Sequence, residues 1–328
     1  MCRFNEMEKI RPTIGIIGAG VTGTALADRL YQQGYHVTAV NSRTLASAQR
    51  LASSISGCAI CSTPQQVADL AQAVFITTPD DRIADIAVAV KWHAGQHVIH
   101  CSGVHSTDIL EPARRFGAFT CCLHPLQTFA SVEEAIHNMR GSTFALEGDP
   151  AALAAAEEMA VALQGNIIRL KASDKILYHA AAVMLSNYLV TLMKTAADLW
   201  QSFGVKQEDA VRAMLPLLKG TVNNIERVGI PGCLTGPIAR GDIGTVQKHL
   251  QALEKDRPST LETYRVLGLQ TIFIALAKGR ISLDTAEELR AALEGKAIFN
   301  ESDYTEFYRM LGFDFAAGTA NQLENKQP

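Results

Sequence analysis

Residues 13–23 read TIGIIGAGVTG, and this stretch decides the fold. A short β-branched run is followed directly by the pattern G-x-G-x-x-G. In such a turn the first glycine permits a tight bend, the second lets the backbone approach a pyrophosphate, and the third lets a helix pack closely on the strand. The following helix offers free backbone N–H groups to an anion. The stretch predicts a dinucleotide-binding turn rather than a glycine turn without a ligand, with contacts from Gly18, Ala19, Gly20, Val21, Thr22 and Gly23.

The end of the next strand indicates which dinucleotide is bound. Residues 37–44 read VTAVNSRT, so Asn41, Ser42 and Arg43 stand where NAD-binding folds carry Asp or Glu. An amide, a hydroxyl and a guanidinium in succession donate hydrogen bonds to a 2′-phosphate, which a carboxylate would repel. The stretch therefore favours NADP(H) as the cofactor. In the alternative interpretation Arg43 is a solvated loop residue.

Strand and helix patterns alternate through the first half of the chain. This rhythm predicts an α/β Rossmann fold with a doubly wound, mainly parallel sheet. After residue 170 strand signals stop, and long helical periods predict an all-α C-terminal domain, with helices at about 174–203, 207–228, 242–255, 258–278 and 282–293. We expect a nucleotide-binding domain over 11–170 and a helical substrate and dimerisation domain over 171–328. The strands are expected at Thr13–Ile17, His36–Val40, Gly57–Cys61, Ala73–Ile76, His97–His100, Ala118–Leu123, Thr143–Leu146 and Ile167–Leu170.

Composition excludes several classes of partner. The net charge is −3 and no Lys/Arg block is present, which argues against nucleic acid and anionic membranes. The apolar run IFIALA is far short of the ~20 residues that span a bilayer, and the first nine residues lack the apolar segment of a secretory signal. We therefore expect a soluble, cytoplasmic protein. The seven cysteines suit reduced thiols in apolar packing, and Cys58 and Cys61 would point to opposite faces of a strand.

Polar residues follow three further strands, at the edge where open parallel sheets bind ligands. Thr77, Thr78 and Pro79 come after the fourth strand, and Ser102 and Gly103 come after the fifth. These turns are expected to contact the cofactor and substrate. His124 ends the sixth strand and is a candidate for proton transfer, although a structural histidine is the alternative, while Gln127 is a candidate for orienting a carbonyl or carboxylate.

The first helix of the second half carries an unusual polar stripe. At 100° per residue, Lys175, His179 and Ser186 share a face with small apolar residues, and Asn187 borders it. Burying such side chains costs free energy unless they are paired or functional. The stripe predicts a helix that presents His179 and Asn187 to a cleft, and a hydrogen-bonded core histidine is the alternative.

A Gly/Pro-containing loop interrupts the helical half at CLTGPIARGD, residues 233–242. Thr235 is a candidate for substrate contact there, and Arg240 could clamp a substrate carboxylate, unless the loop is a plain connector. No metal site is expected, because the histidines near residues 93–105 show no ligand spacing.

Five motifs together resemble a bacterial family with a Rossmann-like domain fused to a helical domain of unknown function. The motifs are IHCSGVHSTDIL, LHPLQTFAS, YHAAAVMLSNYLVTL, LPLLKGTVNNI and LTGPIARGD, within about residues 11–280. This family resembles the superfamily of 6-phosphogluconate dehydrogenase, pyrroline-5-carboxylate reductase and ketopantoate reductase. The resemblance implies NAD(P)H-dependent chemistry on small carboxylate substrates between the domains and a homodimer formed through the helical domain.

The resemblance also implies roles for individual residues. Many relatives carry a catalytic lysine in the first helix of the helical domain, followed four residues later by asparagine. Here Lys175 is followed at that spacing by His179, while Asn187 lies two turns further along. The resemblance also implies that some members of this family serve as an alternative form of ketopantoate reductase. We therefore expect an NADPH-dependent reductase of a small 2-oxo acid, with His179 or His124 as proton donor, Ser102 and Asn187 holding the substrate, and a cyclic-imine reductase or a catalytically silent NADP-binding protein as alternatives.

Overall fold

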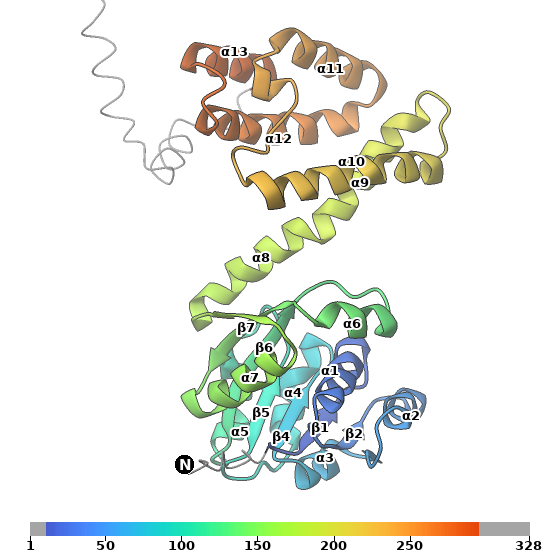
Figure 1. The fold of residues 1–328 in the computed structure, drawn as a ribbon, viewed down its shortest axis with the longest axis vertical. Helices are drawn as coiled ribbons and strands as arrows, with labels where there is room; N and C mark the ends of the chain where they lie inside the picture. The colour runs from blue at the N-terminus through green and yellow to red at the C-terminus, as the bar shows by residue number, and fades with distance from the viewer. Residues whose placement is uncertain (1–10, 295–328) are drawn as a thin grey trace, which may run out of the picture. The chain divides into compact units, whose positions relative to one another are not determined.

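The computed structural model describes residues 11–294, so the N-terminal nine residues discussed above lie outside the described part. Two compact units divide the chain after Leu189, and each is described by itself. The first unit contains an eight-stranded sheet of order β3-β2-β1-β4-β5-β6-β7-β8 (Figure 1). Its strands are β1 (Ile14–Ile17), β2 (Val37–Asn41), β3 (Ala59–Ile60), β4 (Ala73–Ile76), β5 (His97–His100), β6 (Phe119–Leu126), β7 (Thr143–Gly148) and β8 (Asn166–Arg169).

The sheet is parallel except at one pairing. β6 and β7 run antiparallel, with His124 opposite Ala145, whereas every other neighbouring pair is parallel within the described chain. The strand order reverses on either side of β1 and β4, which is the point where doubly wound sheets bind their ligands. The predicted doubly wound, mainly parallel sheet is therefore confirmed.

Helices cover both faces of this sheet and create two apolar cores. Phe75, Leu26 and Met159 belong to one core, and Val74, Val67 and Trp92 belong to the other. Alternate residues of β4 enter opposite cores, because successive side chains of a strand point to opposite faces. The helices of this unit are α1 (Val21–Gln32), α2 (Leu45–Ser53), α3 (Pro64–Leu70), α4 (Ile83–Ala89), α5 (Glu111–Arg114), α6 (Val132–Met139), α7 (Pro150–Ala162) and α8 (Lys175–Leu185), with short 3₁₀ turns η1 (Asp80–Arg82), η2 (Thr107–Leu110) and η3 (Ala172–Asp174).

Helix α8 belongs to the same unit as the sheet. The strand pattern predicts a boundary near residue 171, where the sheet ends, whereas the compact unit extends through α8 to Leu189. The periodicity also predicts one helix over 174–203. The structure divides it at Ser186 into α8 and α9 (Asn187–Gln201). The assignment of 171–328 as the substrate and dimerisation domain stays a prediction.

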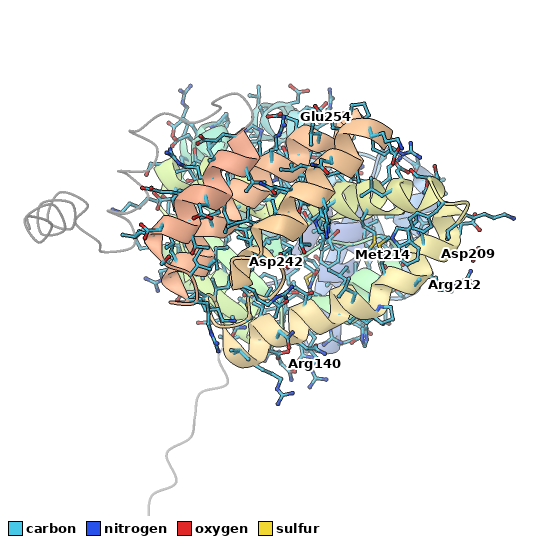
Figure 2. All side chains as sticks on the ribbon, turned by 90° about the horizontal axis from the view of Figure 1, so that it is seen from above. Arg140, Asp209, Arg212, Met214, Asp242 and Glu254 are labelled. Atoms are coloured by element: carbon cyan, nitrogen blue, oxygen red, sulfur yellow. The ribbon has the colours of Figure 1, made fainter. Side chains whose placement is uncertain are left out.

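Helices are the regular elements of the second unit within its described residues, which confirms an all-α C-terminal region. Leu253, Leu269 and Leu289 lie in a core shared by α11, α12 and α13. Asp242, labelled in Figure 2, precedes α11 and caps it by accepting a hydrogen bond from Thr245 N at 3.0 Å. The remaining helices are α9, α10 (Gln207–Val228), α11 (Ile243–Asp256), α12 (Pro258–Ala277) and α13 (Leu283–Glu294), with the 3₁₀ turn η4 (Ile238–Arg240).

Between residues 11 and 294, one stretch is long and apolar enough to cross a membrane by length and composition. It runs over Ala172–Gln201, has a mean hydropathy of 1.5 over its most apolar window, and none of that window is buried. The apolar run IFIALA therefore does not represent the most apolar helical segment of the chain. One such helix is weak evidence for a membrane span, and in this chain Lys175 at its start is buried against the sheet.

Candidate functional site

The three glycines of the first turn have three different surroundings. Gly18 has a φ of +113°, and a Cβ there would lie 2.7 Å from the Thr77 carbonyl carbon. A Cβ at Gly23 would collide with the Gly18 carbonyl oxygen. A Cβ at Gly20 would meet nothing within 4 Å. The first and third glycines are thus required by packing inside the protein, whereas Gly20 keeps an outer space open beside the N-terminus of α1, where a pyrophosphate would fit.

The end of β2 is tied to this turn. Gly18 N donates to the Asn41 carbonyl at 2.8 Å, and Ala19 N donates to Ser42 Oγ at 3.3 Å. The Asn41 amide donates to the Cys61 carbonyl at 2.9 Å, so one of its two N–H donors holds β3 in place. Arg43 is exposed. The hydroxyl hydrogen of Ser42 and the guanidinium of Arg43 remain suited to a 2′-phosphate.

The turn after β4 combines a structural threonine with one whose hydroxyl is unsatisfied. Thr77 Oγ1 donates to the Gly18 carbonyl at 2.6 Å and holds the two turns together. Thr78 Oγ1 is buried, and it has no hydrogen-bond partner among residues 11–294. Pro79, which is exposed, precedes η1. An unsatisfied hydroxyl beside the glycine turn fits a cofactor that would supply its partner.

Ser102 orders the turn after β5. Its side chain is buried, donates to Asp80 Oδ2 at 2.9 Å, and accepts from the backbone N–H groups of Val104 at 3.3 Å and His105 at 3.1 Å. One hydrogen and two lone pairs are thereby used within the protein. The geometry favours a structural role for this hydroxyl, and the predicted contact with substrate stays a prediction.

Lys175 is buried at the start of α8. Its Nζ donates to the Ser102 carbonyl at 2.9 Å and lies 2.8 Å from Cys122 Sγ. The neighbouring ammonium lowers the pKa of the Cys122 thiol, but burial is the larger effect and raises it to about 11. The thiol is therefore protonated near neutral pH. Lys175 connects α8 to the turn after β5 and to β6, a role that periodicity alone does not reveal.

Two histidines converge on Gly103 in that turn. A Cβ at Gly103 would lie 2.6 Å from His179 Cδ2 and 2.9 Å from His124 Nε2. His124 lies on β6 and His179 on α8, and both are half-buried. Only a glycine leaves room for both imidazoles. The structure thus brings together four of the predicted site residues, namely Gly103, His124, Lys175 and His179, at the carboxyl end of the parallel strands.

Tyr178 completes this cluster and was not predicted from the sequence. Its hydroxyl lies 2.7 Å from His124 Nδ1, and the two rings meet edge to face at 89°. The residue stands three positions after Lys175, which is the helical spacing of neighbours on one face. That spacing was the available signal. No local pattern indicates that this face of the helix meets β6.

The other predicted substrate residues lie outside this cluster. Gln127 is exposed, and its side chain accepts from Thr128 N at 2.9 Å beside an open hollow of about 550 Å³ along α6. Asn187 begins α9 and accepts from Ser186 Oγ at 2.9 Å. Thr235 and Arg240 are exposed in the second unit. Their predicted roles as substrate residues stay predictions.

Cysteines and metal ligands form no further centre in the described chain. The six cysteines between residues 58 and 233 are free thiols. Within residues 11–294, no group of three or more His, Cys, Asp or Glu side chains is arranged to hold a metal ion.

Two family models match the chain. A Rossmann-like domain matches residues 3–125, and a domain of unknown function, DUF2520, matches residues 142–271. The chain combines a Rossmann-like domain with a DUF2520 domain. The DUF2520 match begins next to β7, so it includes the last two strands and the helix that carries Lys175, Tyr178 and His179. The cluster around Gly103 is thus built from both matched regions.

Several solved structures of similar fold are named as oxidoreductases or reductases. A candidate NADP oxidoreductase from Bacteroides fragilis is 23% identical, with a TM-score of 0.65 over 80% of this chain and 98% of that one. A reductive aminase from Aspergillus terreus in complex with NADPH and ethyl levulinate is 18% identical, with a TM-score of 0.57 over 92% and 100%. The 1-pyrroline-5-carboxylate reductase of Streptococcus pyogenes is 17% identical, with a TM-score of 0.56 over 86% and 99%. No curated protein matches the sequence. At these identities the likeness concerns the fold.

Proposed function

We propose that this chain is an NADPH-dependent oxidoreductase that reduces a small 2-oxo acid, with ketopantoate as the leading candidate. The observation that carries the proposal is the convergence of His124 and His179 on Gly103. Gly103 lies in the turn after the carboxyl end of β5, and the unsatisfied Thr78 hydroxyl lies in the turn after the neighbouring strand β4. Ligands of doubly wound sheets bind along this edge. A hydride acceptor placed here would have a proton donor beside it.

The cofactor fits the residues present. The open space at Gly20 suits the pyrophosphate, and the Thr78 hydroxyl suits the ribose next to the nicotinamide. Ser42 and Arg43 suit the 2′-phosphate that distinguishes NADPH from NADH. Solved structures of similar fold include a reductive aminase in complex with NADPH, which supports the same assignment.

The protein has to stabilise and protonate the carbonyl oxygen of the substrate. When bound, the cofactor supplies a hydride to the carbonyl carbon of the substrate. Negative charge then develops on the carbonyl oxygen, and the oxygen needs a hydrogen-bond donor followed by a proton. We assign the proton to His179, because histidine gains and loses a proton near neutral pH. Arg240 is the candidate for the substrate carboxylate.

A homodimer accompanies this proposal. Leu217 and Val228 on α10 are 72% and 62% exposed, and Leu185 on α8 is 80% exposed. Large apolar side chains exposed on a helix mark an interaction surface on that helix. A second copy of the chain is the proposed occupant, with the cytoplasm as the proposed compartment.

A reductase of cyclic imines is the second candidate, and the fold shared with a pyrroline-5-carboxylate reductase supports it. Both candidates are tested by following NADPH absorbance with purified protein and a panel of 2-oxo acids and cyclic imines, with NADH in parallel. Turnover of ketopantoate with NADPH and little with NADH is the expected result. Turnover of imines alone would replace the first candidate by the second. Binding of NADPH without turnover of any member would favour a catalytically silent NADP-binding protein.

A further inference from the structure

The hydrogen bond between His124 and Tyr178 fixes more than the position of a ring. The phenol oxygen lies 2.7 Å from Nδ1, and the opposite ring nitrogen, Nε2, lies beside Gly103. Each nitrogen of this imidazole thus has a separate environment. One faces a hydroxyl inside the protein, and the other faces the place where the proposed function puts the substrate.

The surroundings keep both partners uncharged near neutral pH. Burial lowers the pKa of His124 to about 4, and the positive charges of Lys175 and His179 act in the same direction. Burial also raises the pKa of the Tyr178 hydroxyl, with a smaller contribution from Cys122. The ionisable groups around His124 are Lys175, Tyr178 and His179 on α8, His100 on β5 and Cys122 on its own strand.

A neutral imidazole carries one N–H and one lone pair. The Tyr178 hydroxyl has a hydrogen to donate, and the imidazole nitrogen is a strong acceptor at hydrogen-bond distance. Donation from Oη to Nδ1 places the imidazole hydrogen on Nε2. The nitrogen beside Gly103 is then an N–H donor with no lone pair.

We propose that His124 is a neutral hydrogen-bond donor for the carbonyl oxygen of the substrate, and that Tyr178 is a positioning residue that holds His124 in the tautomer with hydrogen on Nε2. The inference rests on the proposed function and deepens it. The hydride adds to the carbonyl carbon, the C=O π pair moves to oxygen, the Nε2–H group stabilises that oxygen, and the proton that completes the hydroxyl comes from His179. His124 keeps its own proton throughout.

This assignment selects a substrate class. A carbonyl oxygen offers lone pairs to the Nε2–H group. A protonated imine offers an N–H group and a positive charge instead, so it would meet the Nε2–H donor of His124 near the positive charge of Lys175, which already acts on His124. The site therefore favours a carbonyl substrate, such as the proposed 2-oxo acid, over an iminium ion. A carbonyl substrate and an iminium substrate, which the fold alone does not separate, thus differ in their fit to His124.

Side-chain ¹H–¹⁵N NMR of the full chain tests the tautomer without any turnover. The His124 signals are assigned by their loss in His124→Gln. We expect a neutral ring with hydrogen on Nε2 from about pH 8 to about pH 5.5, and a mixture of tautomers in Tyr178→Phe. Hydrogen on Nδ1, or a protonated ring at neutral pH, would overturn the proposal. Because this readout does not depend on activity, it separates failure of this inference from failure of the proposed function.

Kinetics of two amide variants test the role of the donor. In His124→Gln an amide N–H can occupy the place of Nε2, whereas in His124→Asn the amide reaches only as far as Nδ1. We expect kcat of the glutamine variant within about tenfold of wild type, and a loss of about 10²-fold or more in the asparagine variant. Equal, large losses in two variants that unfold at the wild-type temperature would instead make His124 the proton donor.

Discussion

Lys175 Nζ lies 2.9 Å from the carbonyl oxygen of Ser102, which joins the first turn of α8 to the turn after β5. The same turn contains Gly103, on which His124 and His179 converge. A buried ammonium that donates to a backbone carbonyl is held more firmly than an ion pair on the surface, because no water is available to replace its hydrogen bond. The position of His179, one helical turn after Lys175, depends on this connection.

Replacing Lys175 by methionine is expected to destabilise the chain. The change leaves the Ser102 carbonyl without its charged donor, and such a loss costs about 1–3 kcal/mol in the free energy of unfolding. Urea unfolding of the full chain measures it, with the exposed Lys91→Met as the matched control. A Lys175→Met variant that loses activity at wild-type stability would contradict this view and return the residue to a catalytic role.

The glycine turn offers a variant that separates binding from folding. Gly20→Val adds a side chain to open space at a φ of −79°, so we expect wild-type thermal stability and at least about a tenfold loss of NADPH affinity. Fluorescence of bound NADPH measures the affinity. Gly220→Ala, also in open space but on α10, is the control and should bind normally. Unchanged affinity in Gly20→Val would place the cofactor elsewhere.

Arg43→Ala is expected to reduce the preference for NADPH over NADH. Removing a charged donor from the 2′-phosphate weakens NADPH binding by about tenfold or more and leaves NADH binding nearly unchanged. The ratio of the two dissociation constants is the measurement. Arg115→Ala is the control, because it removes the same charge from a side chain that is 75% exposed and lies just before the amino end of β6. This variant should leave the ratio of the two dissociation constants unchanged. Equal weakening of both cofactors by Arg43→Ala would contradict the assignment.

The free energy of unfolding should decrease as the pH falls below about 6.5, the ordinary pKa of histidine. His100 is fully buried, and burial lowers its pKa to about 3, so the unfolded chain binds a proton there that the folded chain does not. With an unfolded pKa of about 6.5, this histidine lowers the free energy of unfolding by about 2 kcal/mol between pH 7 and pH 5. His100→Gln should lose less stability over that interval in urea unfolding. A variant with the wild-type pH dependence would show that other groups cause it.

The apolar helices predict a dimer in detergent-free buffer. Sedimentation of the wild-type chain should give twice the monomer mass, and Leu217→Asp with Val228→Asp should shift it toward monomer. A wild-type monomer would contradict the proposed partner. Recovery of the chain in the membrane fraction would show instead that lipid covers the apolar stretch Ala172–Gln201.

Much of the first unit could be predicted from the sequence, because local patterns determine it. The strands Ala73–Ile76 and His97–His100 occur as predicted, since buried parallel strands are short β-branched runs between turn residues. Helix α1 begins at Val21, because the glycine turn leads straight into its first turn. Helix α6 is not among the predicted helices, although a serine at 131 is a typical N-cap residue. In the structure the Ser131 side chain accepts a hydrogen bond from Glu134 N.

The site was harder to predict, because its contacts join distant segments. Helical periodicity placed Lys175 and His179 on one face, and the structure confirms that Lys175 is buried. Nothing local to Tyr178 reveals that it meets His124, since that contact depends on how α8 packs against β6. Ser102 is a residue type that often binds ligands, yet its hydroxyl is hydrogen-bonded to Asp80 and to two backbone N–H groups. Residue type indicated the region of the site, and packing decided the roles within it.

The most direct test of the central claim is the initial rate of NADPH oxidation with ketopantoate in wild type, His179→Gln and the exposed control His93→Gln. The account predicts turnover in wild type and in His93→Gln, and a rate lower by about 10²–10⁴-fold in His179→Gln. Wild-type turnover that His179→Gln leaves unchanged would contradict it, because the reduction would then take its proton from somewhere other than the cluster around Gly103.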